Sequence, residues 1–178
     1  MNHRLPLLLS TLLALAACQQ PGPATPADTE TRTGSNRRSL EQLAAPANGF
    51  AVSADLSQRY RVGDDIRFTV DSARAGWLWV VQVDADDAVT VLYPNRHRRD
   101  NAIRAGQPLR VPPAGAAWGL EAAEPLGPTL VAFIVTTGKD RLDRVLQTGA
   151  ALPEGLRLRD DQPWGLAKQT ITIEARQP

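Results

Sequence analysis

The stretch GWLWVVQVDADDAVTVLY, residues 76–93, decides the fold class. It holds two apolar runs rich in Val and aromatic residues, separated by the short acidic segment Asp84–Asp87. Such runs are typical of strands, and Asp favours turns because its side chain bonds nearby backbone amides. The first run is apolar at successive positions, which predicts a strand covered on both faces. The stretch therefore predicts a β-hairpin inside a covered sheet.

Further short strands are predicted on both sides of this hairpin. Ile66, Phe68 and Val70 alternate with polar residues, as in a half-buried strand. Residues 140–146 have helical spacing and predict the single helix, short and near the C-terminus. This pattern predicts a mainly β fold, an antiparallel β-sandwich of immunoglobulin-like arrangement, with a small barrel as the alternative. The other predicted strands cover residues 109–111, 118–122, 130–136 and 170–173.

The N-terminus, residues 1–17, predicts a lipoprotein signal peptide. An early Arg precedes an apolar run that is too short to span a membrane. The run ends in Leu-Ala-Ala-Cys, which resembles the bacterial lipobox, and Cys18 is the only cysteine. We expect lipid on Cys18 to hold the protein at a membrane. Gln19, where the enterobacterial sorting rule would need Asp for retention, indicates the outer membrane, with the domain facing the periplasm.

Residues 18–47 are predicted to form the lipidated Cys and a disordered tether. The segment is rich in Pro, Thr, Ala, Gly and Ser, and its large apolar residues are Leu40 and Leu43. Such a composition buries too little surface to offset the entropy of ordering. Residues 39–45 could form one helical turn, and a partner-binding segment around Arg37 and Arg38 is the alternative. Residues 48–178 have the length of one domain with one core.

Charge and residue usage exclude several function classes. The chain has 20 Lys and Arg against 19 Asp and Glu, a net charge of +1, and loss of Arg4 with the signal peptide would balance them. We expect no nucleic-acid partner, since that would need a net basic face. After removal of the signal peptide, His97 would be the only remaining histidine. We therefore expect neither a multi-His metal site nor a cofactor.

An enzymatic function is not expected. A GxSxG motif is absent, and no Ser stands in a recognisable nucleophile setting. Acidic pairs such as Asp160 with Asp161, and Glu121 with Glu124, could serve glycoside cleavage, but ordinary surface charge explains them equally well.

The stretch that follows the hairpin contains a candidate binding loop. Asn95, Asp100 and Asn101 are typical turn formers. A turn does not require the basic residues between them, and guanidinium groups bind carboxylates and phosphates. An ordinary solvated loop is the alternative. The candidate residues are Asn95, Arg96, His97, Arg98, Arg99, Asp100 and Asn101.

Trp77 and Trp79 form a second candidate site. They lie two residues apart, hence on one strand face, where they could form a stacking platform for a glycan. Val81 and Val83 continue that face, which favours a place in the core. The Asp-rich segment between the strands lacks the Gly and Glu of a calcium-binding loop, so a turn is the better interpretation. Trp118 and Trp164 fit either a core or a surface role.

Residues 50–137 contain an ordered run of potential motif residues: Tyr60, Gly63-Asp64, Tyr93-Pro94-Asn95, Asp100-Asn101, Ala105-Gly106 and Pro112. Through this run, the stretch resembles the bacterial "domain of unknown function 4384" family. The resemblance implies a β-rich accessory domain, often found on lipoproteins or attached to kinases and caspase-like peptidases, with some members encoded near secretion systems. The family has no established catalytic residues to carry over. At Asp87 family members tend to have Gly, which predicts a longer turn here.

Together these features predict an outer-membrane lipoprotein that acts as a non-catalytic binding or scaffold accessory of an envelope assembly, such as a secretion system. Its expected partners are the membrane, through Cys18, and an envelope protein, with peptidoglycan as a further candidate. One alternative is a module that senses peptidoglycan, another glycan or a small ligand. The other is a periplasmic inhibitor of an effector or a lytic enzyme.

Overall fold

The computed structural model describes residues 34–138 and 162–176. Within these ranges, no helix is long and apolar enough to cross a membrane. Several sequence predictions fall outside them: the signal peptide, Cys18, the helix at 140–146 and the Asp160-Asp161 pair.

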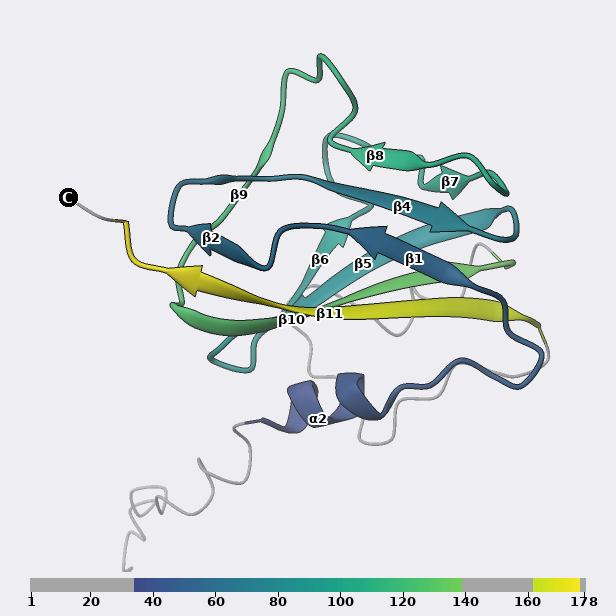
Figure 1. Cartoon of the computed structure of the whole chain (residues 1–178), viewed down its shortest axis with the longest axis horizontal. Helices are drawn as coiled ribbons and strands as arrows, with labels where there is room; N and C mark the ends of the chain where they lie inside the picture. The colour runs from purple at the N-terminus through teal and green to yellow at the C-terminus, as the bar shows by residue number, and fades with distance from the viewer. Residues whose placement is uncertain (1–33, 139–161, 177–178) are drawn as a thin grey trace, which may run out of the picture.

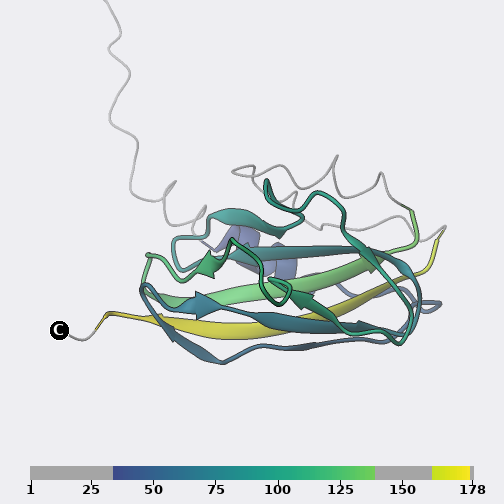
Figure 2. The same ribbon diagram turned by 90° about the horizontal axis from the view of Figure 1, so that it is seen from above.

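The described chain forms two layers of strands, seen from above in Figure 2. In the smaller sheet the order is β1-β4-β8, and both pairings are antiparallel. These strands are β1 (Val52–Asp55), β4 (Phe68–Ser72) and β8 (Leu109–Val111).

The larger sheet has the order β2-β11-β10-β5-β6, and all its pairings are antiparallel except β2 with β11. β7 (Ala102–Ile103) pairs with the start of β5, and β3 (Asp65–Ile66) pairs with β9 (Leu120–Glu121). The main strands are β2 (Arg59–Arg61), β5 (Gly76–Val83), β6 (Val89–Tyr93), β10 (Gly127–Thr136) and β11 (Trp164–Glu174).

This arrangement confirms the predicted mainly β, antiparallel sandwich. The described strands form separate sheets that do not close on each other, so the small-barrel alternative is wrong. The order β11-β10-β5-β6 opposite β1-β4-β8 is that of an immunoglobulin-like sandwich. β11 pairs with β10 along ten residue pairs, so residues 164–174 complete the larger sheet.

The main core lies between the two sheets. Phe68 on β4 meets Phe133 on β10 edge to face, with ring centroids 5.4 Å apart and planes inclined by 72°. Leu78 and Val80 face the same core from β5, whereas Trp79 belongs to the cluster on the opposite face of the larger sheet. β5 is therefore covered on both faces, as its unbroken apolar sequence predicts.

The predicted hairpin is present as β5 and β6. The carboxylate of Asp84 accepts hydrogen bonds from the backbone amides of Asp86, at 3.0 Å, and Ala88, at 2.9 Å. The acidic segment is thus a turn held by its own first side chain, which confirms the turn interpretation.

Two predicted strands differ from the structure. The strand expected around Ile66 to Val70 is interrupted at Arg67, which separates β3 from β4, although its apolar residues are buried as expected. The strand expected at 118–122 shortens to β9, Leu120–Glu121. The other predicted strands are β8 and parts of β10 and β11.

The segment before the sandwich is folded, contrary to the prediction of a tether up to residue 47. Helix α2 (Ser35–Gln42) lies against the outer face of the larger sheet (Figure 1). Leu40 is 0% exposed and Leu43 is 3% exposed, in one cluster with Trp79 and Val81. Two leucines are enough to attach this segment because they pack on an apolar face of the sheet. Residues of the predicted tether, from α2 to Leu43, are therefore part of the described fold.

Side chains of the sheet hold both ends of α2. At the N-terminus, the carboxylate of Asp87 accepts hydrogen bonds from the backbone amides of Asn36, at 3.0 Å, and Arg37, at 2.8 Å. At the C-terminus, the Lys168 ammonium donates to the carbonyls of Leu40, Glu41 and Leu43. These are the helix-terminal groups that lack partners within a helix, and each charge has the sign that the helix dipole favours.

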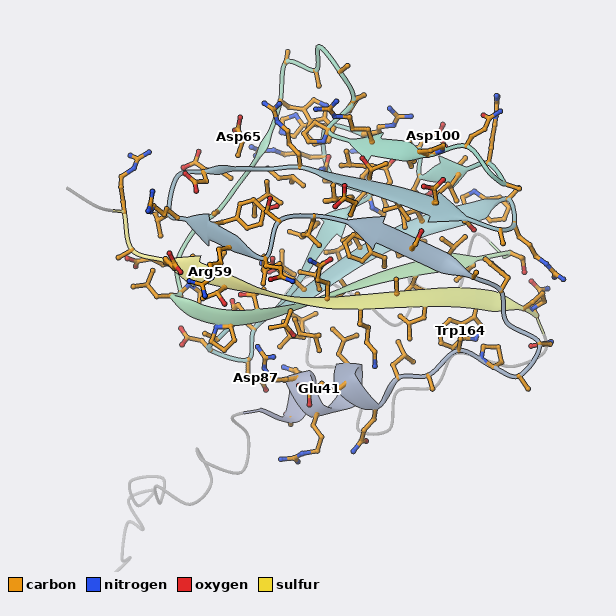
Figure 3. All side chains as sticks on the ribbon, in the orientation of Figure 1. Glu41, Arg59, Asp65, Asp87, Asp100 and Trp164 are labelled. Atoms are coloured by element: carbon orange, nitrogen blue, oxygen red, sulfur yellow. The ribbon has the colours of Figure 1, made fainter. Side chains whose placement is uncertain are left out.

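Asp87 has a φ of 63°, in the left-handed region that favours Gly. It adopts this conformation while its carboxylate makes the contacts to α2. In Figure 3, Asp87 lies beside the first turn of the helix.

Candidate functional site

The first candidate site begins with a tight hairpin that we call the arginine loop, residues 95–99. The backbones of Asn95 and Arg98 bond each other in both directions, at 3.1 and 3.2 Å. The Asn95 side chain accepts from the amides of His97 and Arg98 and donates to the carbonyl of Leu92. One Asn thus fixes the hairpin from inside.

The next residues attach the arginine loop to the core. The buried Tyr93 hydroxyl donates to the carbonyl of Asp100 at 2.8 Å, and the Asp100 carboxylate accepts from the amide of Ala102 at 3.2 Å. Asn101 is 2% exposed and donates from Nδ2 to the carbonyl of Leu78 at 3.0 Å. Burial raises the pKa of Tyr93, and the nearby Arg98 charge partly opposes that rise.

The structure divides the candidate loop residues into a frame and an exposed part. The sequence predicted Asn101 as a candidate contact residue, but Asn101 is buried, and Asn95 and Arg98 are half-buried. Asn101 is buried because its side chain donates a hydrogen bond to the carbonyl of Leu78, a residue 23 positions away. The exposed residues are Arg96, His97, Arg99 and Asp100.

Trp118 extends the exposed surface of the arginine loop. It comes from the segment between β8 and β9, which projects above the smaller sheet in Figure 1. Its ring stacks on His97, with centroids 5.6 Å apart and planes inclined by 7°. Arg96 donates from Nε to Nε2 of His97 at 3.0 Å. A cation, an imidazole and an indole are thereby joined in one surface.

A pocket of about 420 Å³ adjoins this surface, and we call it the Trp118 pocket. Its charged lining residues are Asp65, Arg67 and Arg110. Arg67 pairs with Asp65, with Nη2 and Oδ2 3.0 Å apart, whereas Arg110 has no partner among the described residues. Arg110 lies on the outer face of the smaller sheet, opposite Thr69 on β4, and Arg67 directly precedes β4.

The second candidate site, the tryptophan platform, is not available as a surface. Trp79 is 4% exposed and packs in the cluster that includes Leu40 and Leu43 of the α2 segment. Trp77 is half-buried. The core interpretation therefore holds for Trp79, because α2 covers the face on which a glycan would have to stack.

Within residues 34–138 and 162–176, no group of three or more His, Cys, Asp or Glu residues is placed to hold a metal ion.

The central part of the sandwich matches a known protein family. Residues 59–139 match the family model of a domain of unknown function, DUF4384. The match spans β2 to β10 and contains both the arginine loop and the Trp118 pocket, while α2 and β11 lie outside it. No curated protein and no solved structure matches the chain.

Sequence patterns alone did not assign Arg67, Arg110 and Trp118 to one site. The alternation of Arg67 and Thr69 with Phe68 does place the two polar residues on one face. The register of β4 against β8, which adds Arg110 to that face, depends on pairing between distant segments.

Proposed function

We propose that this protein is a periplasmic lipoprotein anchored to the outer membrane through Cys18, and that it serves as a non-catalytic binding or scaffold accessory of an envelope assembly. A secretion system is one such assembly. The arginine loop is the contact surface for a protein partner.

The observation that carries this proposal is the rigid frame under an exposed basic surface. Asn95, Tyr93 and Asn101 hold the loop by hydrogen bonds, while Arg96 and Arg99 extend into solvent. Pre-ordering a loop reduces the entropy cost of binding, and guanidinium groups form bidentate bonds with carboxylates. Both properties favour recognition of an acidic protein surface.

The position of the surface also supports an anchored accessory. The chain enters the domain at α2, against the outer face of the larger sheet, whereas the projecting segment with Trp118 lies on the opposite side of the sandwich (Figure 1). An anchor on Cys18 would therefore leave the contact surface directed away from the attachment point.

Photo-crosslinking in cells tests this proposal. A photoreactive amino acid replaces Arg99 in the full chain, and a matched variant carries it at the exposed Arg38 on α2. We expect a discrete crosslinked envelope protein from position 99 but not from position 38. Equal crosslinking from both positions, or none from position 99, would contradict the proposed contact surface.

A second experiment tests the lipid anchor on Cys18. Cys18→Ser should move the protein from the membrane fraction to the soluble fraction. Retention of the variant in the membrane would contradict lipid anchoring through this residue.

A further inference from the structure

We propose that the Trp118 pocket binds a small ligand that carries one carboxylate, with Arg110 as the residue that holds it. This inference does not depend on the proposed function, because the pocket and the arginine loop use different arginines.

The charges of the pocket point to a single negative charge on the ligand. Asp65 already neutralises one of the two guanidinium groups, through its 3.0 Å contact with Arg67. Among the charged lining residues, one net positive charge therefore remains, on the unpaired Arg110. A monoanion would balance it, whereas a dianionic phosphate would leave an unneutralised charge near the carboxylate of Asp65.

The geometry of the strands places the two arginines within reach of one group. Thr69 and Arg110 face each other across β4 and β8, and Arg67, which directly precedes β4, lines the same pocket as Arg110. A carboxylate held by the fork of Arg110 would therefore lie in a pocket that Arg67 also lines.

The remaining walls suit the uncharged part of such a ligand. Trp118, Pro112 and Pro113 line the pocket and offer an aromatic and aliphatic surface. The stacking of His97 on Trp118 supports the indole from outside the pocket lining. A volume of about 420 Å³ is in the range of small-molecule sites. A short peptide with a free C-terminus and an acidic sugar both have this chemistry.

Ligand-observed NMR on the detergent-solubilised full chain tests the proposal. The probes are N-acetyl-alanyl-alanine, its C-terminal amide, glucuronic acid, glucose and inorganic phosphate. We expect a carboxylate probe to bind and its neutral counterpart not to bind. Binding of the dipeptide acid identifies a peptide as the source of the carboxylate, and binding of glucuronic acid identifies a sugar.

Two arginine variants assign the site. Arg110→Gln should weaken binding of the carboxylate probe at least tenfold, since a charge-assisted bond is lost. Arg104→Gln, a change at an exposed arginine that does not line the pocket, should leave binding unchanged. Both variants replace the guanidinium by a shorter, neutral amide, and unchanged thermal unfolding confirms that each is folded.

Three results would overturn the inference: no carboxylate probe binds, the neutral probes or phosphate bind as tightly, or Arg110→Gln binds as the parent does. Because none of these involves Arg96 or Arg99, failure of the pocket leaves the partner-binding proposal to its own test.

Discussion

Asp87 and Lys168 bind opposite ends of helix α2, although both residues come from other parts of the chain. Asp87, from the β5–β6 turn, binds the first amides of α2, and Lys168, from β11, binds its last carbonyls. A short polar helix that would be unstable alone is thereby fixed to the sandwich.

Loss of the Asp87 charge should weaken this attachment. Asp87→Asn keeps a residue that tolerates the left-handed backbone but removes the charge and one acceptor. We expect a loss of about 1 kcal/mol in the free energy of unfolding, measured by urea denaturation. Asp86→Asn, in the exposed neighbouring position, should change stability little. Equal effects of the two changes would show that Asp87 does not hold the helix.

Lys168→Met should release the other end of α2. The change keeps an apolar stem and removes the donor to three carbonyls. Hydrogen exchange should accelerate for the amides of residues 38–42 while it stays unchanged in β4. Combined with Asp87→Asn, the loss of stability should be smaller than the sum, because both contacts hold the same helix. Strict additivity would mean that the two ends act independently.

The apolar contact of α2 should be worth more than either polar end. Leu40→Ala removes a fully buried side chain and should cost about 2–5 kcal/mol in urea denaturation. Leu126→Ala is the matched control, since Leu126 is 46% exposed. If both substitutions cost the same, α2 is not part of the cooperative core.

The frame of the arginine loop should depend on Asn101. Asn101→Ala removes the buried bond to the carbonyl of Leu78 and should cost about 1–3 kcal/mol. Hydrogen exchange in the arginine loop should accelerate as well. Gln107→Ala, at an exposed position, serves as the control. Unchanged exchange in Asn101→Ala would contradict a rigid frame.

The raised pKa of Tyr93 predicts a loss of stability at high pH. An unfolded tyrosine releases its proton near the ordinary value of 10.0, while the buried one retains it. Above about pH 10 the unfolded state therefore binds fewer protons, and the free energy of unfolding falls as pH rises. Below that pH the contribution is fully present. Tyr93→Phe should show a shallower decline above pH 10, and parallel curves for parent and variant would refute this origin.

Strands followed from local sequence, whereas attachments between distant segments did not. The unbroken apolar run of β5 and the acidic turn after it depend on residues that are adjacent in sequence, so the covered hairpin could be predicted. Helix α2 was not, because its stability rests on partners 51 and 125 positions away. The burial of Asn101 could not be predicted for the same reason. Asn is a common turn-forming residue, and its type alone does not indicate that its side chain bonds to the distant Leu78.

The measurement that tests the central proposal most directly is recovery of a partner by the tagged full chain from envelope extract. The double variant Arg96→Glu with Arg99→Glu is compared with the parent and with Arg38→Glu combined with Arg61→Glu. The control changes the same amount of charge at exposed positions outside the arginine loop. We expect a stoichiometric envelope protein with the parent and the control, and at least a tenfold loss with the double variant. Equal recovery by all three proteins would contradict the arginine loop as the contact surface.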